Sequence, residues 1–371
     1  MSIDKFYYDW WKNIDKSILL LITLLFSLGL FFSLVSTSLI ASDKLNTNSY
    51  YFFFKHFFYI GIGIFFIIFF SSLSKNNLFN ISILLFIIFF IFLILVPIIG
   101  VEVKGSKRWL NILFLPRFQP IEILKPFIII VIALVLCAEK EKNIYYKYFL
   151  SFAIISPIIF LLTTQPDIGQ TLLIFLTWLS LIFISGISLF IFFIFFGTIL
   201  SILMYLIFFI PKFKYVRDRI ESFFNPISGT HNFQSDKASE AIINGGFFGK
   251  GIGEGVLKNR VPEAHTDYIV SVISEEFGAV IIILLMILFL LFIYQVFKKL
   301  NLEKNNKAKL ILVGSITLIL LQALIHIGVN IRLFPTTGMT LPFLSYGGSS
   351  IIGTAILSGI ILNLTKRRII N

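Results

Sequence analysis

The sequence predicts an all-α integral membrane protein that forms a single polytopic domain over residues 1–371. Of its 371 residues, 57% are hydrophobic and only 13% are charged, and the mean hydropathy is +0.94. Soluble domains carry about 25% charged residues, so this composition excludes a soluble fold. The apolar residues also fall into separate runs that are each long enough to cross a bilayer.

Because one span needs about 20 mainly apolar residues, these runs predict about ten transmembrane helices. The first run is too long for the core of a cleaved signal peptide and is expected to remain as the first span. A large extracytoplasmic loop, residues 211–266, is predicted between helices 7 and 8. The predicted spans are 18–41, 53–72, 79–98, 121–138, 148–164, 168–186, 188–210, 267–297, 309–331 and 345–364.

Basic residues in the short loops predict that both termini, residues 1–17 and 365–371, lie in the cytoplasm. The short inner loops hold Lys75, the lysines of residues 140–147 and those of residues 298–309. The protein is therefore expected in the cytoplasmic (inner) membrane. The remaining basic residues face outward, where either a phosphate-bearing ligand or anionic lipid headgroups would account for them. No nucleic-acid partner is expected.

The first outer loop combines basic residues with an aromatic ring. Lys107 and Arg108 precede Trp109, and together they predict a cationic patch at the membrane interface. Farther on, Glu122 and Lys125 share one face at the start of a span. An ordinary ion pair at the end of a membrane helix would explain these two residues. Opposite charges at membrane depth also favour a pocket wall.

Three other segments have structural as well as functional interpretations. Asp167 stands at the start of a predicted helix, where an aspartate side chain caps free amides. Residues 211–224 are basic and aromatic and could form an amphipathic helix on the outer leaflet. The glycine-rich residues 245–255 could cradle phosphate oxygens with their amides or serve as a flexible hinge.

A group of ionisable residues ends the large loop. Glu263, His265 and Asp267 lie within five positions and could hold a hard cation weakly, but such cations usually bind with substrate phosphates. Asp267 could also act only as a helix cap. Ser271 and Glu275 continue the polar face into the next span, so this stripe must line a cavity or contact another helix. With one cysteine and four histidines, no zinc or iron–sulfur site is expected.

The last outer segment, residues 330–350, contains prolines, glycines and hydroxyl side chains at the membrane surface. This composition predicts irregular backbone. Such backbone is tolerated at membrane depth only against protein or a water-filled cavity.

These segments, in this order, resemble the SEDS family (shape, elongation, division and sporulation) of membrane peptidoglycan glycosyltransferases, and the likeness covers residues 18–368. Pro262-Glu-Ala-His-Thr-Asp267 and Gly338-Met-Thr-Leu-Pro342 are similar to the division branch, FtsW, and less similar to the elongation branch, RodA. The motifs that carry the resemblance are Lys-Arg-Trp, Gln-Pro-x-Glu-x-x-Lys, Gln-Pro-Asp-x-Gly, the glycine-rich loop, His-Thr-Asp, Glu-Glu-x-Gly and Pro-Phe-Leu-Ser-Tyr-Gly-Gly-Ser-Ser.

The resemblance implies polymerisation of lipid II during septal cell-wall synthesis, at the division septum. The partners it implies are a class B penicillin-binding transpeptidase and other division proteins. The essential aspartate of the family falls on Asp267. The residues expected to bind the diphosphate or the sugar are Lys107, Arg108, Gln119, Glu122, Lys125, His265, Ser345 and Tyr346.

Two positions depart from the family pattern. Ile121 stands where the family usually has serine, so a hydroxyl contact there is in doubt. Thr337 replaces the lysine common in the division branch and cannot supply a cation.

The expected chemistry is inverting glycosyl transfer, in which Asp267 accepts the proton of the acceptor 4-hydroxyl group. Lys107, Arg108 and Lys125 are the candidates for binding the diphosphate. No firm cofactor is expected, although a divalent cation, Mg²⁺ or Mn²⁺, could accompany the diphosphate. A lipid II flippase, an elongation-type polymerase and a non-catalytic scaffold for the transpeptidase are the alternatives.

Overall fold

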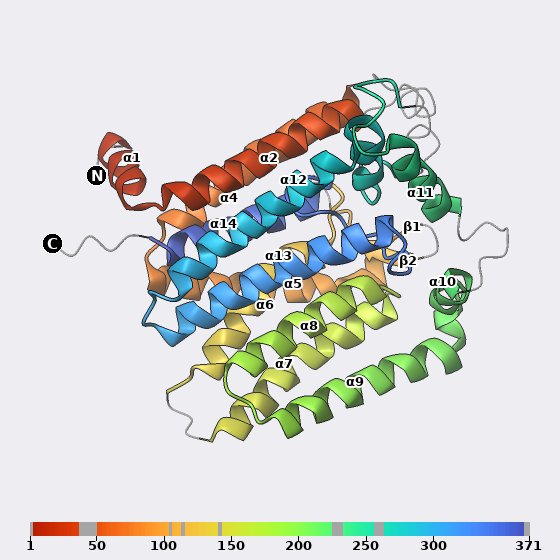
Figure 1. Ribbon diagram of the computed structural model, residues 1–371. Helices are drawn as coiled ribbons and strands as arrows, with labels where there is room; N and C mark the ends of the chain where they lie inside the picture. Colours follow the sequence, from red (N-terminus) through yellow and green to blue (C-terminus); the bar gives the residue numbers. More distant parts are fainter. Residues whose placement is uncertain are drawn as a thin grey trace.

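The protein is a bundle of long helices lying roughly side by side (Figure 1). The computed structural model describes residues 3–36, 50–103, 106–112, 116–139, 143–224, 233–255 and 263–366. The first described helix begins and the last described helix ends at the same end of the bundle (Figure 1). The membrane side that this end faces stays a prediction, and Lys140, Lys142 and most of the tail 365–371 lie outside the described residues.

The elements follow one another along the chain as a nearly unbroken series of helices. They are α1 (Ile3–Asn13), α2 (Lys16–Ser36), α4 (Tyr51–Ser72), α5 (Lys75–Ile99), β1 (Val101–Val103), β2 (Ser106–Trp109), α6 (Pro120–Leu136), α7 (Ile144–Thr164), α8 (Ile168–Ile184), α9 (Leu189–Phe209), η1 (Pro211–Phe213), α10 (Lys214–Phe224), α11 (Phe233–Gly245), α12 (Ile269–Leu300), α13 (Asn306–Asn330) and α14 (Gly348–Leu364).

The all-α prediction is confirmed, although β1 and β2 form a small antiparallel hairpin that the sequence analysis missed. Among the described helices, seven are long and apolar enough to cross a membrane: α2, α4, α5, α7, α9, α12 and α13. The shorter helices α8 and α14 are also apolar, and α6 carries Glu122 and Lys125 within its 17 residues. The larger predicted number of spans depends on counting these three helices, and it stays a prediction.

The first predicted span and the predicted large loop differ most clearly from the structure. The first span was predicted over residues 18–41, and the structure has α2 from Lys16 to Ser36. Residues 37–49 lie outside the described part of the chain. The predicted loop 211–266 contains two helices. One of them, α10, confirms the expected helix within residues 211–224. The other, α11, was not predicted because its sequence is polar and lacks a strong apolar periodicity.

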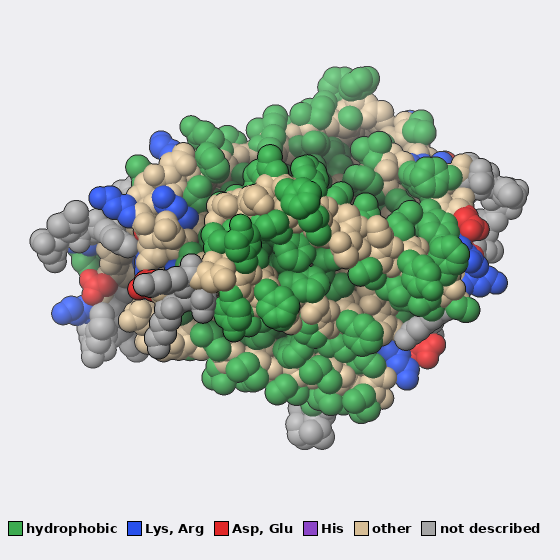
Figure 2. All heavy atoms as spheres, turned by 90° about the horizontal axis from the view of Figure 1, so that it is seen from below, with side chains coloured by type: hydrophobic (Ala, Val, Ile, Leu, Met, Phe, Trp, Pro, Cys, Tyr) green, Lys and Arg blue, Asp and Glu red, His purple; other side chains and the backbone are tan. Residues whose placement is uncertain are grey.

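The core of the bundle consists of α6, α8, α13 and α14, in which most side chains are buried. By contrast, α9 fully buries only Ile199, Leu203 and Ile207, and its other apolar side chains are half-buried or exposed. Figure 2 shows one long face of the molecule covered by hydrophobic side chains, with charged groups gathered at the two ends. An apolar belt between two charged ends is the surface that a bilayer requires. The chain is therefore a multi-pass membrane protein.

A glycine allows α14 to lie very close to α6. A Cβ atom at Gly353 would come within 2.2 Å of the Glu122 carbonyl oxygen. Close approach of helix backbones at small residues is a common packing mode in membrane bundles. This contact places the start of α6, and with it Glu122, directly against α14.

We expect Gly353→Ala to destabilise the bundle by about 1–3 kcal/mol, because the added methyl group pushes α14 away from α6. Gly61→Ala in α4 is the matched control, since a Cβ atom there meets nothing within 4 Å. Thermal unfolding in detergent measures both variants. An equal melting temperature for the two would contradict the close packing of α14 on α6.

Candidate active site

Asp267 lies in a tight turn that precedes α12, at the end of the bundle opposite the chain termini (Figure 1). The carbonyl oxygen of Glu263 accepts hydrogen bonds from the amides of Thr266, Asp267 and Tyr268 at 3.1, 3.1 and 3.3 Å. Glu263 itself has a φ of 56°, a left-handed conformation that is uncommon for residues with side chains. The turn brings Asp267 to the edge of α12 with its side chain only partly buried.

Asn330, the last residue of α13, fixes the backbone around Asp267. Its Nδ2 atom donates to the Asp267 carbonyl oxygen at 3.1 Å. Its Oδ1 atom accepts from the amide and the hydroxyl group of Ser271 at 3.2 and 2.8 Å. One buried amide therefore connects the turn to the first turn of α12. The expectation that the polar stripe contacts other helices is confirmed, since Glu275 also accepts from Asn244 of α11 at 3.0 Å.

The segment before α14 holds the other side of the turn. The Ser345 hydroxyl donates to the Thr266 carbonyl oxygen at 2.7 Å, and the Tyr346 amide donates to the His265 carbonyl oxygen at 3.0 Å. The His265 ring packs against Phe52 with centroids 4.3 Å apart. Burial lowers the pKa of His265, and Glu263 opposes this shift. The lowered pKa disfavours the charged form of His265 at neutral pH, so this ring is poorly suited to attract an anion.

A small cavity opens beside the Asp267 side chain. It has a volume of about 30 Å³ and is lined by Arg219, Gln234, Thr337 and Gly338 among others. A neighbouring hollow of about 180 Å³ shares Arg219 and also contains Arg332, which forms an ion pair with Asp236. Arg219 donates from Nη1 to the Thr336 carbonyl oxygen at 2.9 Å. Asp267 therefore borders a hollow with a cationic wall, formed by α10 and the segment after α13.

Arg108 and Gln119 both contact Asp167, whose predicted helix-capping role is confirmed by the hydrogen bond from the Gln170 amide at 3.3 Å. Arg108 Nη1 lies 3.6 Å from Asp167 Oδ2, and Gln119 Nε2 donates to the same oxygen at 3.1 Å. Arg108 also donates to the Pro166 carbonyl oxygen at 2.6 Å. These contacts anchor the hairpin and the start of α6 to the start of α8. Lys107, in contrast, is exposed on β2.

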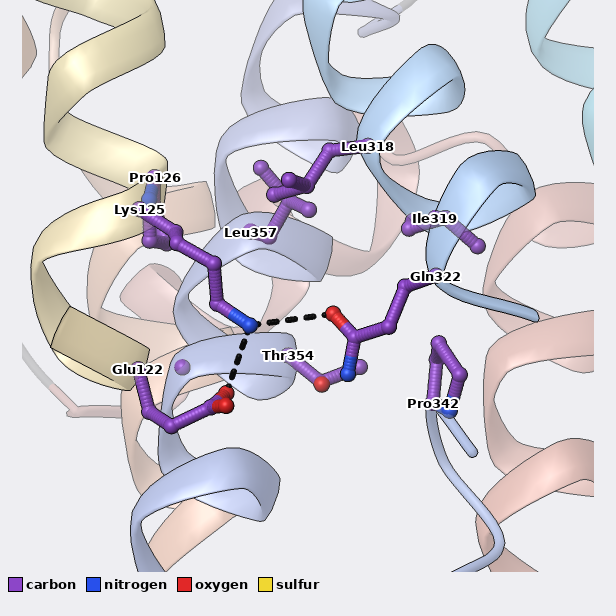
Figure 3. A pocket seen from close by; sticks show the side chains of 10 residues that line it. Glu122, Lys125, Pro126, Leu318, Ile319, Gln322, Pro342, Thr354 and Leu357 are labelled. Atoms are coloured by element: carbon purple, nitrogen blue, oxygen red, sulfur yellow. Dashed lines mark hydrogen bonds and ion pairs between the residues drawn. The ribbon is translucent and has the colours of Figure 1, made fainter. Parts of the chain in front are cut away.

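Glu122 and Lys125 form a buried ion pair, with Oε2 and Nζ 2.7 Å apart (Figure 3). Lys125 also donates to Gln322 Oε1 at 3.0 Å, and Gln170 donates to the other Glu122 oxygen. Glu122, Lys125 and Gln322 line a cavity of about 10 Å³, room for roughly one water molecule. A buried pair of this kind is costly to break because either partner alone would be an uncompensated charge.

The residues around Asp167 and those around Asp267 both lie against residues 337–340. A Cβ atom at Gly169 would come within 2.9 Å of Thr337 Cβ and 3.4 Å of Met339. Gln322 donates to the Thr340 carbonyl oxygen at 3.0 Å, which ties the same stretch to the Lys125 cluster. The irregular backbone expected here is confirmed, and the protein interior supplies its hydrogen-bond partners.

The glycine-rich segment forms hydrogen bonds with the backbone on both sides of an interruption in α12. Gly278 is not helical, with φ 77° and ψ 178°. The amides of Lys250 and Gly251 donate to the carbonyl oxygens of Glu275 and Glu276 at 2.9 and 3.0 Å. Beyond the break, the amides of residues 279 and 280 donate to the carbonyl oxygens of residues 246 and 247. The amides of Lys250 and Gly251 are occupied, so the phosphate-cradle hypothesis is wrong for these two. The flexible hinge stays a hypothesis.

The sequence analysis missed Arg219, Gln234 and Asn330 as site residues. Arg219 belongs to the basic helix that was interpreted as a surface element, and only the fold brings it to Asp267. Within the described ranges, no three residues among His, Cys, Asp and Glu lie close enough to hold a metal ion. Glu263, His265 and Asp267 therefore do not form such a cluster.

Comparison with known proteins gives one consistent result. The family model FtsW/RodA/SpoVE, described as "Cell cycle protein", matches residues 15–369. The chain is 32% identical over 368 residues to a protein of Caulobacter vibrioides named "Probable peptidoglycan glycosyltransferase FtsW", covering 97% of this chain and 91% of that protein. It is 37% identical over 289 residues to a protein of the same name from Buchnera aphidicola, covering 76% and 81%.

Solved structures are similar over nearly the whole chain. A chain described under "Structural coordination of polymerization and crosslinking by a peptidoglycan synthase complex" has a TM-score of 0.77 and 25% identity, covering 95% of this chain and 97% of that one. The rod shape determining protein RodA of Thermus thermophilus has a TM-score of 0.67 and 23% identity, covering 96% and 97%. The second likeness bears on the fold alone.

We expect Gly249→Ala to disturb the site more than Gly253→Ala. Both glycines have positive φ, 79° and 86°, so both variants carry similar backbone strain. Only at Gly249 would the Cβ atom also collide, at 2.2 Å, with the Glu276 carbonyl oxygen. The melting temperature should fall further for Gly249→Ala. Equal losses for the two variants would mean that the loop does not depend on its contact with the α12 break.

Proposed function

The chain belongs to the FtsW/RodA/SpoVE family of cell cycle proteins, and we propose that it is the peptidoglycan glycosyltransferase that polymerises lipid II during cell division. The observation that carries this proposal is the position of Asp267. Its backbone is fixed by Asn330, and its side chain borders a hollow with Arg219 in its wall. A carboxylate beside a cation at the end of a membrane bundle suits a substrate with a hydroxyl group and a phosphate.

In the proposed reaction, Asp267 takes the proton from the 4-hydroxyl group of the acceptor sugar. The freed oxygen attacks the anomeric carbon of the donor and forms the new glycosidic bond. The bond from that carbon to the diphosphate oxygen breaks, and its electron pair leaves with the polyprenyl diphosphate. The configuration inverts in this single displacement. Since a diphosphate is already a good leaving group, a base and stabilisation of the developing negative charge suffice.

Arg219 and Lys107 are the cations that we assign to the diphosphate. Arg219 lines the cavity beside Asp267, and a planar guanidinium matches phosphate oxygens in geometry and charge. Lys107 is exposed on β2. Arg108 and Lys125, which the sequence also suggested, contact Asp167 and Glu122, so we assign them the positioning of α8 and α6.

The turn that carries Asp267 is held by His265, Ser345 and Tyr346. The start of α6 is held by Gln119 and Glu122. We therefore propose that these five residues orient the site around the substrate. A divalent cation, Mg²⁺ or Mn²⁺, would enter with the substrate diphosphate. Its contribution would be to neutralise the charge that develops on the leaving group.

The proposed location is the division septum of the cytoplasmic membrane, with both termini in the cytoplasm and Asp267 on the outer side. The proposed partners are a class B penicillin-binding transpeptidase, which would crosslink the new strands, and other division proteins. The similar chain from a peptidoglycan synthase complex supports a partnership of this kind.

A lipid II flippase is the main alternative. Transporters place their substrate sites near the middle of the membrane. The buried polar cluster of Glu122, Lys125 and Gln322 encloses only about 10 Å³, which is far too small for a sugar. The hollows that border Arg219, of about 180 and 30 Å³, lie near the bundle end instead. This arrangement favours an enzyme over a flippase. A scaffold for the transpeptidase would not need a carboxylate at position 267.

Asp267→Asn should reduce polymerisation by about 10²–10⁴-fold, because a general base contributes a factor of this size. Gel analysis of glycan strands from labelled lipid II measures the rate, with the transpeptidase present. Glu221→Gln, on α10 with a side chain 60% exposed, is the control and should keep full activity. An active Asp267→Asn enzyme would exclude Asp267 as the base. Transport of lipid II by proteoliposomes that make no glycan would identify a flippase.

Arg219→Gln should slow polymerisation by about 10–100-fold, the effect of losing a charge-assisted hydrogen bond to the diphosphate. Arg217→Gln is the matched control, since Arg217 lies two residues away on α10 and contacts Glu221 at 3.7 Å. Steady-state kinetics over a range of lipid II concentrations compares the two variants. Equal rates for both would show that Arg219 does not bind the leaving group.

A further inference from the structure

A second polar cavity lies at the other end of the bundle, where the two chain termini are found. Its volume is about 790 Å³, which is within the range of roughly 300–1,000 Å³ typical of ligand sites. The ends of α6, α8 and α13 and the first turn of α7 form its wall. The assigned chemistry at Asp267 takes place at the opposite end of the molecule, so this cavity has no part in the proposed reaction.

Three lysines line this cavity. Lys307 lies 3.8 Å from Glu139, but the Glu139 side chain is 90% exposed, so water screens this pair. Lys147 and Lys309 are half-buried, and neither forms an ion pair with another residue in the described part of the chain. The positive charges of two lysines that line one cavity repel each other and favour an anion between them.

The surroundings reinforce this positive charge. Lys307 adds a third positive charge to the wall of the cavity. The positive end of the 25-residue helix α13 also faces the cavity through Asn305 and Asn306.

One side of the cavity borders exposed apolar and aromatic side chains. Ile184 lines the cavity and is 50% exposed, and Tyr145 and Tyr146 at the start of α7 are 60% and 50% exposed. Exposed aromatic rings at this depth are typical of the boundary between hydrocarbon and headgroups. Figure 2 shows the same change, from apolar side chains along the bundle to charged ones at its ends. An anion that enters from this side would carry an acyl chain.

We propose that this cavity binds the phosphate of an anionic phospholipid from the leaflet on this side, held between Lys147 and Lys309. The acyl chains would lie along the apolar surface beside Ile184, and the glycerophosphate would fill the polar interior. A free phosphate ion shares the recognised chemistry but would gain nothing from the apolar flank.

The test uses the full-length protein in nanodiscs of phosphatidylcholine alone or of equal parts phosphatidylcholine and phosphatidylglycerol. Native mass spectrometry counts the phosphatidylglycerol molecules that stay bound to the protein after its release from the nanodiscs. The wild type should retain it, and Lys147→Gln/Lys309→Gln should weaken its binding by at least about tenfold. Lys147→Arg/Lys309→Arg keeps both charges and should retain the lipid. This variant separates lost recognition from lost folding.

Lys298→Gln/Lys304→Gln is the matched control, because it removes the same charge from exposed lysines at the same end of the bundle but outside the cavity. This pair should bind phosphatidylglycerol as the wild type does. Equal weakening in the two glutamine pairs would mean diffuse attraction to the leaflet and would overturn the proposal. Inorganic phosphate that displaces the bound phosphatidylglycerol completely at low millimolar concentration would point to a free-anion site and would also overturn it.

Discussion

Everything at the proposed active site depends on one constraint: backbone that leaves helical geometry at the membrane must find its hydrogen-bond partners within the protein. The turn before α12 meets this requirement through Asn330, Ser345 and Tyr346. The break within α12 meets it through the glycine-rich segment. Because Asn330 belongs to α13 and the other two partners precede α14, the backbone around Asp267 is held by two separate parts of the chain.

The charged side chains near the proposed active site have neighbouring polar groups that hold them in place. Glu122 pairs with Lys125, and Arg108 pairs with Asp167. Breaking either pair would leave a charge without compensation. Asp267 and Arg219 border the same cavity. A fixed frame around a base and a cation is what electrostatic catalysis requires, since groups that are already oriented need no rearrangement during the reaction.

The sequence was sufficient for the features that local chemistry determines. Apolar runs located the membrane helices, the Asp167 side chain caps α8 as expected, and the polar stripe of Ser271 and Glu275 contacts neighbouring helices. It was insufficient where partners lie far apart in the chain. The glycines at 249 and 278 are explained only by their mutual contact across the break in α12. Similarly, the role of Arg219 depends on the packing of α10 near Thr336.

The pH dependence of kcat/KM for lipid II polymerisation tests most directly whether Asp267 acts as a base. The account predicts that the rate falls on the acidic side with unit slope as one carboxylate is protonated. It also predicts that this acidic limb is missing from the residual activity of the Asp267→Asn enzyme. An identical acidic limb in both enzymes would assign the proton transfer to another group and would contradict the mechanism.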